Sequence, residues 1–452
     1  MLLPVFMLPT VSAAAEPAAL HPAVTAAPEK PSAQSFTLEQ AIDYALANNP
    51  DLQIASERIS QAEAQLGVAL SAFYPQVTAK VGYEQSNNPA QVFAMIVAQR
   101  DYNSSQNINN PGYRQNFRPE IIGKLSLFRG GQDYLASEAA KLGIDAAEFE
   151  RSTVHNALIE AVTATYYAYL AAQEAHKVAQ DSITAIASEL KQTKLRFDAG
   201  TVLKSDLLSL DVQMAAAQEA EIRAANGIEL SKTGLANLLG LSGNQAFTVA
   251  AASLLPQPKM AASSFNDLLE LAMTQRPEVK AAAKQVEIAQ LKLKSEQGAY
   301  LPKADAYVSY GQNSATPGFS SSKDNVTAGV SVEMDLFSGF STQQRVSAAE
   351  RKAAEARETE RKTKLAIEQD VKTAFLKLQE ALARLNVTEA SVRSAEEALR
   401  LVNEERSAEI VTVTRYIESE TASNKARSNT IAAHYDALSA EAALKKAVGD
   451  WK

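Results

Sequence analysis

The residues Leu127-Phe128-Arg129-Gly130 and Leu336-Phe337-Ser338-Gly339 are two versions of one short sequence, and they reveal how this chain is built. The separation between the two versions is kept to the end of the chain, where Gly240 has its counterpart in Gly449. Self-similarity at a fixed separation indicates a repeated structural unit. The sequence therefore predicts that the fold is made of two copies of one unit.

The duplication extends upstream of these two sequences. Pro50 and Pro277 are as far apart as Pro75 and Pro302, and the segments between these prolines align without a gap. Each copy reads as helix, strand, loop, strand and then very long helices, with the longer loop in the first copy. We divide the chain into a secretory signal at 1–15, a flexible lead-in at 16–35, a first repeat at 36–245, a linker at 246–263 and a second repeat at 264–452.

The N-terminal segment has the features of a secretory signal. An apolar run from Leu2 to Leu8 precedes small residues at 11–15, which fits the hydrophobic region and cleavage site of such a signal. No basic region precedes the run, as expected if the true start lies further upstream. A disordered hydrophobic tail is the alternative interpretation. The stretch rich in Pro and Ala that follows has the composition of a segment without fixed structure.

The composition argues against several classes of function. A formal charge of −8 over 452 residues provides no basic footprint for nucleic acid. Without cysteine the chain has no disulfide, no thiolate metal site and no lipidated N-terminal Cys, so we do not expect a lipoprotein. The histidines stand in no motif with carboxylates or a phosphate loop. We therefore expect no enzyme, no metal and no cofactor.

Four segments alternate between apolar and polar residues, at 75–86, 119–128, 301–312 and 325–337. Alternation over about ten residues is typical of a membrane-spanning β-strand, although a half-buried sheet in a soluble domain gives the same pattern. No window of about 18 apolar residues occurs, so a membrane crossing would require strands closed into a barrel. Because the smallest closed barrels use about eight strands, several chains would have to share one barrel.

Two stretches without proline, 132–244 and 341–452, predict very long helices. A helix over residues 132–197 would be about 100 Å long at 1.5 Å per residue. Apolar residues recur every seven positions, which indicates coiled-coil packing; they are Val371, Leu378, Leu385, Val392 and Leu399, matched by Val162, Tyr169, His176, Ile183 and Leu190. His176 could be a ligand or a packed residue of the seam, and no second ligand stands four residues later, so we assign it no function.

The motifs occur in the order found in one known family. They are Phe36–Ala41 leading to Asn49-Pro50, Ala72–Pro75 at the first strand, the duplicated sequence at 127–130 and 336–339, and the turn Phe197–Thr201. From about residue 36 to 450 the chain resembles the TolC family of outer-membrane factors. The fold that this resemblance implies is mainly α-helical, with long coiled-coil helices forming an α-barrel and four strands per subunit contributing to a shared, trimeric barrel of about twelve strands.

The resemblance also implies a function and partners. The protein would be a homotrimer in the outer membrane of a Gram-negative bacterium, in contact with outer-membrane lipid and extending into the periplasm. It would conduct substrates passively outward in efflux or type I secretion, joined through a periplasmic adaptor to an inner-membrane pump of the RND, ABC or MFS type. A soluble periplasmic coiled-coil scaffold or adaptor is the alternative, although adaptors would not show this whole-chain duplication.

The same resemblance places adaptor docking at the tips of the two helical hairpins. The docking residues are Phe197, Gly200, Thr201, Val202, Arg406, Glu409, Ile410 and Val411. The second tip departs from the family pattern, because Arg406 replaces an aromatic residue and Glu409 stands where glycine is expected.

The candidate pore-constriction residues are Asp206, Arg415 and Glu418. We hypothesise that Glu418 forms a ring of carboxylates at the constriction and that Arg415 locks the closed state through ion pairs with a neighbouring subunit. The alternative is that both residues lie on an ordinary solvated helix face, where such pairs contribute little.

Overall fold

A computed structural model describes residues 34–241, 247–250, 257–259, 264–408 and 410–451. The predicted signal at 1–15, most of the lead-in and much of the linker lie outside the described residues. The described residues of the lead-in and of the linker form two short strands that we did not predict. Strand β1 (Gln34–Phe36) pairs in parallel with β4 (Phe247–Val249). Residues 34 and 35 of the lead-in and 247–249 of the linker therefore belong to a small sheet that joins the two ends of the first repeat.

Each repeat begins with two helices separated by a capping residue. In the first, Thr37 and Gln40 form a capping box at the start of α1 (Leu38–Asn48), and the Asn49 side chain caps α2 (Pro50–Leu70). In the second, Ser264 caps α6 (Phe265–Gln275), and α7 (Pro277–Gly298) follows directly. Proline at the first position of α2 and α7 suits a helix start, where its missing N–H is not needed.

The predicted long helices are confirmed. Helices α4 (Gln132–Asp198) and α8 (Ser341–Ser407) have 67 residues each, and each turns back into a helix of 36 residues, α5 (Lys204–Leu239) or α9 (Val413–Val448). Gly240 and Gly449 end the shorter helices in the left-handed conformation, with φ of +70° and +81°. Both glycines occupy the position after a helix where that conformation is commonest.

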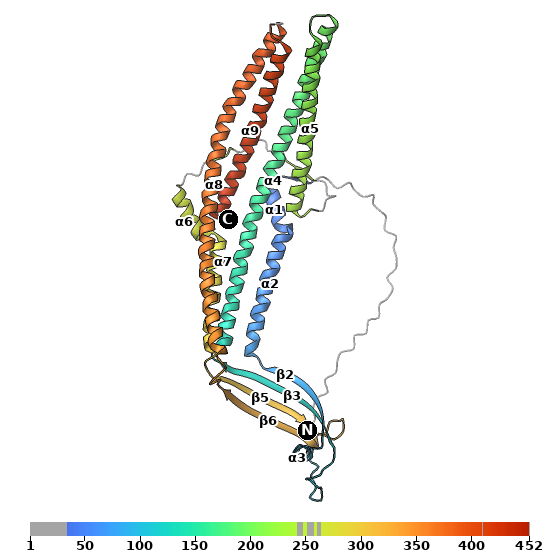
Figure 1. Ribbon diagram of the computed structural model, residues 1–452, viewed down its shortest axis with the longest axis vertical. Helices are drawn as coiled ribbons and strands as arrows, with labels where there is room; N and C mark the ends of the chain where they lie inside the picture. The colour runs from blue at the N-terminus through green and yellow to red at the C-terminus, as the bar shows by residue number, and fades with distance from the viewer. Residues whose placement is uncertain (1–33, 242–246, 251–256, 260–263, 409, 452) are drawn as a thin grey trace, which may run out of the picture.

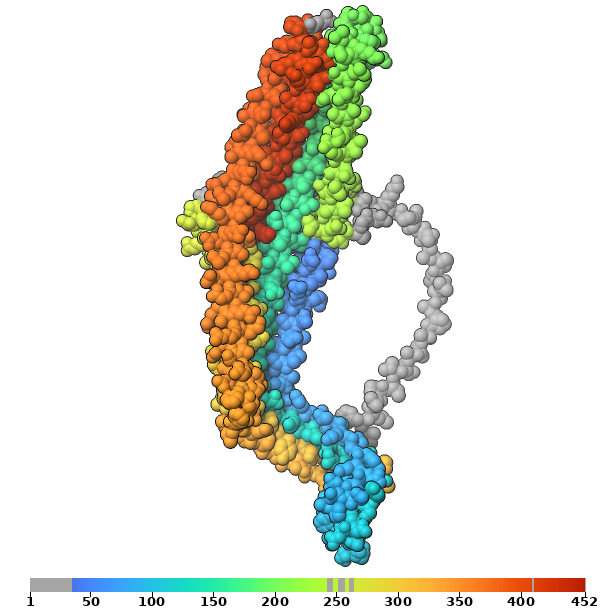
Figure 2. Space-filling model, viewed as in Figure 1, coloured from blue at the N-terminus to red at the C-terminus, as the bar shows by residue number. Residues whose placement is uncertain are grey.

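The helices lie side by side in a long layer (Figure 1), with the sheet at one end and the tips of the hairpins at the other. Near the sheet the order is α2, α4, α7 and α8, and near the tips it is α5, α4, α9 and α8. Figure 2 shows the elongated outline of this layer, with α2 and α8 at its two borders. Among the described residues, no helix combines the length and the apolar character needed to cross a lipid bilayer.

The predicted seven-residue seams are buried over part of their length, whereas Val392 and Leu399 further along α8 are half-buried. Val371, Leu378 and Leu385 expose at most 5% of their surface, and Val162 exposes none. Val371 and Leu378 belong to a cluster that joins α6, α8 and α9, and Val162 belongs to a larger one around α1, α4 and α5. Burial of this stripe, rather than helix propensity alone, stabilises helices of such length.

The four predicted strands form one antiparallel sheet in the order β2–β3–β5–β6. Their bounds are Gln76–Ser86, Arg114–Arg129, Lys303–Gln312 and Asp324–Glu333. Two predicted bounds were wrong by more than two residues. β3 starts five residues before position 119, because pairing with β2 continues to Ser86 and Arg114. β6 ends at Glu333 and not at 337, because no strand residue of β5 precedes Lys303 to pair with it.

The longer loop of the first copy, between β2 and β3, contains a helix that we did not predict. This helix is α3 (Pro89–Ala98), capped by the Asn88 side chain, with Val92, Met95 and Ile96 buried. This apolar stretch is too short for the periodicity that predicts a helix, although its Asn-Pro start is a helix signal.

Candidate membrane face and hairpin tips

The register of the sheet sorts its side chains onto two faces. Ala79, Ile121, Tyr310 and Val326 form one row across all four strands. The rows on either side are also apolar; this apolar face consists of Val77, Ala79, Val81, Tyr83, Ile121, Gly123, Leu125, Ala306, Val308, Tyr310, Val326, Ala328 and Val330. Val77 exposes 72% of its surface and Val330 65%. A continuous exposed apolar face of this kind marks contact with lipid or with another protein.

The opposite face of the sheet is polar. The Lys80 ammonium lies 3.9 Å and the Arg118 guanidinium 3.5 Å from the Glu120 carboxylate on this face. Tyr307 lies over Gly329 here, since a Cβ atom on that glycine would come within 2.7 Å of the Tyr307 hydroxyl. We call this surface the polar face. Charge on one side and an apolar surface on the other is the pattern of a strand between lipid and a watery lumen.

Both borders of the protomer are open. Among the described residues, β2 and β6 each have a neighbouring strand on one side only, so each has a row of unpaired backbone groups on its other side. The helices at the two borders expose large apolar side chains, among them Val68 on α2 (70%) and Val387 on α8 (69%). Both the sheet and the helical layer are therefore incomplete within one chain.

The first hairpin tip is a compact turn. Gly200 has a φ of +79°, and the N–H and Oγ1 of Thr201 both donate to the Arg196 carbonyl at 2.9 Å. Phe197 is 37% exposed, which places it at the edge of this surface. Val202 and Asp206, the latter in the first turn of α5, are both half-buried. The structure brings all of the predicted residues of this tip together.

The second hairpin tip differs most at Arg406, whose side chain points into the molecule. Arg406 is 8% exposed, and its Nε and Nη2 donate to the Glu189 carboxylate on α4 at 2.9 and 2.8 Å. Its Nη1 also donates to the Val411 carbonyl within the turn. Of the other predicted docking residues here, Ile410 is 74% exposed, Val411 is half-buried and Glu409 lies outside the described residues. Arg406 therefore joins the two hairpins and is not on the tip surface.

A buried polar cluster extends inward from this contact, and sequence analysis missed it. Glu420 on α9 is 4% exposed, and Asn424 donates to it and to Ser182 of α4, both at 2.8 Å. Burial, followed by the charges of Glu420 and Glu189, raises the pKa of Tyr416 to about 12. The sequence did hold one indication of this cluster, because Arg406 stands where the first copy has Phe197. A buried arginine needs a carboxylate partner, but the spacing of residues along the chain could not identify Glu189 as that partner.

The predicted constriction residues Arg415 and Glu418 lie on the exposed side of α9. Their charged groups are 3.6 Å apart within one helix, and each side chain is 62% exposed. An exposed pair of this kind contributes at most about 1 kcal/mol to stability. Within one protomer Arg415 is therefore only weakly held.

His176 of the seam has a partner on the neighbouring helix. Its Nε2 lies 2.8 Å from a Glu221 oxygen on α5 and links the two helices of the first hairpin. Within the described part of the chain, no group of three or more His, Asp or Glu side chains is arranged to hold a metal ion.

Comparison with known proteins gives a consistent result. The family model described as "Outer membrane efflux protein" matches residues 41–241 and 268–450. Protein CyaE of Bordetella pertussis is 26% identical over 317 residues, which cover 70% of this chain and 63% of that protein. The pyoverdine export outer membrane protein OpmQ of Pseudomonas putida is 26% identical, covering 62% of this chain and 57% of its own length. The chain thus matches less than two thirds of the length of these two relatives.

Solved structures share the fold. The CmeC outer membrane channel of Campylobacter jejuni superposes with a TM-score of 0.78 at 17% identity, covering 91% of this chain and 85% of that one. At this level of identity the likeness concerns the fold alone.

Proposed function

The chain belongs to the outer membrane efflux protein family, and on that premise we propose that it is the passive outer-membrane channel of a tripartite export system. In this proposal the protein resides in the outer membrane of a Gram-negative bacterium and reaches into the periplasm. Its substrates arrive from an inner-membrane pump through a periplasmic adaptor. The single observation that carries the proposal is the sheet with one apolar and one polar face and two open edges.

The open borders favour a homotrimer. A lipid-facing sheet edge would leave unsatisfied backbone groups in hydrocarbon, which costs several kcal/mol for each group. Four strands are too few for a closed barrel, whereas three chains would supply about twelve. In the same assembly α8 of one subunit would pack on α2 and α5 of the next, which covers the exposed apolar residues of these borders. The polar face then lines the lumen.

The proposed partners act at the two hairpin tips. The first tip presents Phe197, Gly200 and Thr201, and the second presents Ile410, on surfaces open to a helical hairpin of an adaptor. Adaptor identity would fix the type of pump, RND, ABC or MFS, and hence the class of cargo.

The test uses the absence of cysteine from the chain. Single cysteines at Thr201 and Val411 are cross-linked in living cells, and the captured partner is identified by mass spectrometry. We expect both sites to capture a periplasmic adaptor, and a cysteine at the exposed but remote Tyr134 to capture none. A trimer that requires detergent for extraction but captures no periplasmic partner would contradict the tip assignment. Release by salt or osmotic shock would favour the soluble scaffold instead.

We also propose that Arg415 and Glu418 act at the constriction. Because their mutual pair is exposed and weak, Arg415 is available to a carboxylate of a neighbouring subunit. Arg415→Ala should then raise conductance in planar bilayers. Arg400→Ala, which removes an exposed ion pair on the neighbouring helix α8, should not. Equal conductance of Arg415→Ala and the unsubstituted channel would leave both residues as ordinary solvated positions.

A further inference from the structure

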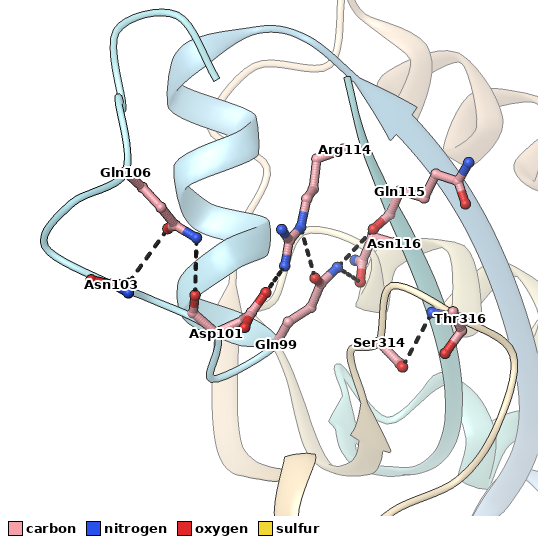
Figure 3. Close-up of polar contacts among 9 residues, drawn as sticks. All are labelled: Gln99, Asp101, Asn103, Gln106, Arg114, Gln115, Asn116, Ser314 and Thr316. Atoms are coloured by element: carbon pink, nitrogen blue, oxygen red, sulfur yellow. Dashed lines mark hydrogen bonds and ion pairs between the residues drawn. The ribbon is translucent and has the colours of Figure 1, made fainter. Parts of the chain in front are cut away.

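Helix α3, in the first hairpin loop, lies against the polar face of the sheet. Its C-cap residue Gln99 is fully buried and donates Nε2 to the Asn116 Oδ1 at 3.2 Å and to the Gln115 carbonyl at 2.8 Å. Arg114 donates Nε back to the Gln99 Oε1 at 3.1 Å (Figure 3). Arg114 and Asn116 alternate along β3 with the apolar positions and share their side with Arg118 and Glu120. The helix is thus seated on the side that carries the charges.

The segment after α3 is fixed to both β-hairpins, β2–β3 and β5–β6. Arg100 donates Nη1 to the Ser322 carbonyl and Nη2 to the Asp324 carbonyl, both at 2.6 Å, at the start of β6. Asp101 forms an ion pair with Arg114, whose hydrogen bond holds the pKa of that carboxyl below its ordinary value. Gln99 contacts β3 and Arg100 contacts the start of β6, so the segment after α3 crosses the end of the sheet. It is held there at both sides.

Arg100 adopts a conformation that arginine rarely takes. Its φ is +54°, directly after a helix, where glycine is the usual residue. A non-glycine residue in this region costs on the order of 1 kcal/mol. The two guanidinium bonds to the other hairpin offset this cost. Strain of this kind, maintained by specific contacts, often occurs at functional sites.

The far side of α3 is apolar and exposed. Val92, Met95 and Ile96 face inward, whereas Phe93 is 40% and Val97 51% exposed, one helical turn apart on the same side. The helix contains no charged residue, and the Phe93 ring meets the Tyr102 ring edge-on at 5.8 Å. An uncharged ridge, Phe93 and Val97, therefore points away from the sheet on its polar side.

We propose that α3 forms a hydrophobic constriction at the outer mouth of the channel. This inference rests on the proposed function, in which the polar face lines the lumen of a trimer. Three copies of the ridge then face one another across the opening, each on a helix about 15 Å long. A narrow apolar ring excludes water and slows hydrophilic and charged solutes. The ring therefore restricts inward passage of such solutes from the medium.

The test follows access from outside the cell to a residue below α3. Thr327 and Ala328 are neighbouring, exposed residues of β6 on the polar and the apolar face, respectively. The labelling rate of Thr327→Cys by a membrane-impermeant, sulfonated maleimide is measured in intact cells. The rate is measured with the native loop and with two loop variants. Phe93→Ser/Val97→Ser changes only exposed side chains. Arg100→Gly relieves the strained φ but removes the guanidinium bonds to the start of β6. Ala328→Cys is the matched control for the lipid side.

We expect both loop variants to label Thr327→Cys at least about tenfold faster than the native loop, with Ala328→Cys unchanged. Equal rates for Thr327→Cys in all three backgrounds would overturn the constriction. Tyr113→Cys, 74% exposed in the same loop, reports on the proposed function separately. If Tyr113→Cys reacts only after lysis, the loop is not outside the cell, and the outer-membrane channel fails together with its mouth.

Discussion

The two hairpin tips began as copies of one structure, yet they are held in different ways. The first is held locally, by the left-handed Gly200 and by the bonds of Thr201 to the Arg196 carbonyl. The second depends on the first hairpin, because Arg406 reaches across to Glu189 on α4. Tyr416 and Glu420 extend this buried polar contact along α9. The two copies thus share the shape of the unit. Because Arg406 stands where the first copy has Phe197, the second tip is held by a contact with the first hairpin.

The difference has a physical consequence for any motion of the tips. A turn held by its own backbone keeps its form wherever the hairpin moves. A buried ion pair between hairpins has to break, or move as a unit, if the two hairpins separate. Breaking such a pair is costly, because each charge is then left without its partner in a poorly solvated site.

Arg406→Ala should have the largest effect of the substitutions that distinguish the two tips. It leaves the buried Glu189 carboxylate without its partner, and we expect a loss of about 3–5 kcal/mol in the free energy of unfolding. Chemical denaturation of the detergent-solubilised protein, followed by circular dichroism, measures it. Arg400→Ala on the same helix, where the pair is exposed, should cost less than about 1 kcal/mol. Replacement of both charges, by Arg406→Met with Glu189→Leu, should recover most of the loss; a double variant as unstable as Arg406→Ala would contradict this account.

A second prediction compares the glycines that end the shorter helices. Both have positive φ, but a Cβ on Gly240 would lie 2.6 Å from the Asn48 carbonyl oxygen, whereas a Cβ on Gly449 meets its nearest atom at 3.3 Å. Gly449→Ala should therefore cost about 1–2 kcal/mol for the backbone conformation alone. Gly240→Ala should cost about 1 kcal/mol more, since the clash involves backbone that cannot turn aside. Thermal unfolding of the two variants side by side decides it, and a larger loss for Gly449→Ala would be the opposite of our expectation.

The smallest expected effect concerns the pH dependence of the second tip. The folded protein raises the pKa of Tyr416 to about 12, above the ordinary value of 10.0, so the folded state keeps a proton that the unfolded state releases. The contribution of Tyr416 is complete below pH 10 and is lost as pH rises from 10 towards 12, with about 1 kcal/mol gone at pH 11. Denaturation at pH 8 and pH 11 should show a smaller drop for Tyr416→Phe than for the native protein. At the matching position of the first tip, Leu207 carries no such group.

Much of the architecture follows from the sequence because it rests on periodicity and length. The seven-residue spacing of Val371, Leu378 and Leu385 predicts their burial, and the proline-free stretches predict the starts and the unusual length of α4 and α8. Alternation predicts the four strands, and the repeat predicts that they come in matched pairs. The exposed residues of the first tip were predicted as well, since a turn with Gly200 is a local feature.

Only the tertiary structure decided the features that join distant segments. Glu189 and Arg406 lie on different helical hairpins. The paired strands β1 and β4 lie at the two ends of the first repeat. Arg100 binds the start of β6, a strand of the second repeat. Helix α3 is short and apolar, so its place on the polar face depends on the contacts of Gln99 and not on any periodicity. Local preferences act between neighbours in the chain and can be read in order. Contacts across the fold depend on how the two repeats come together, which spacing along one chain does not specify.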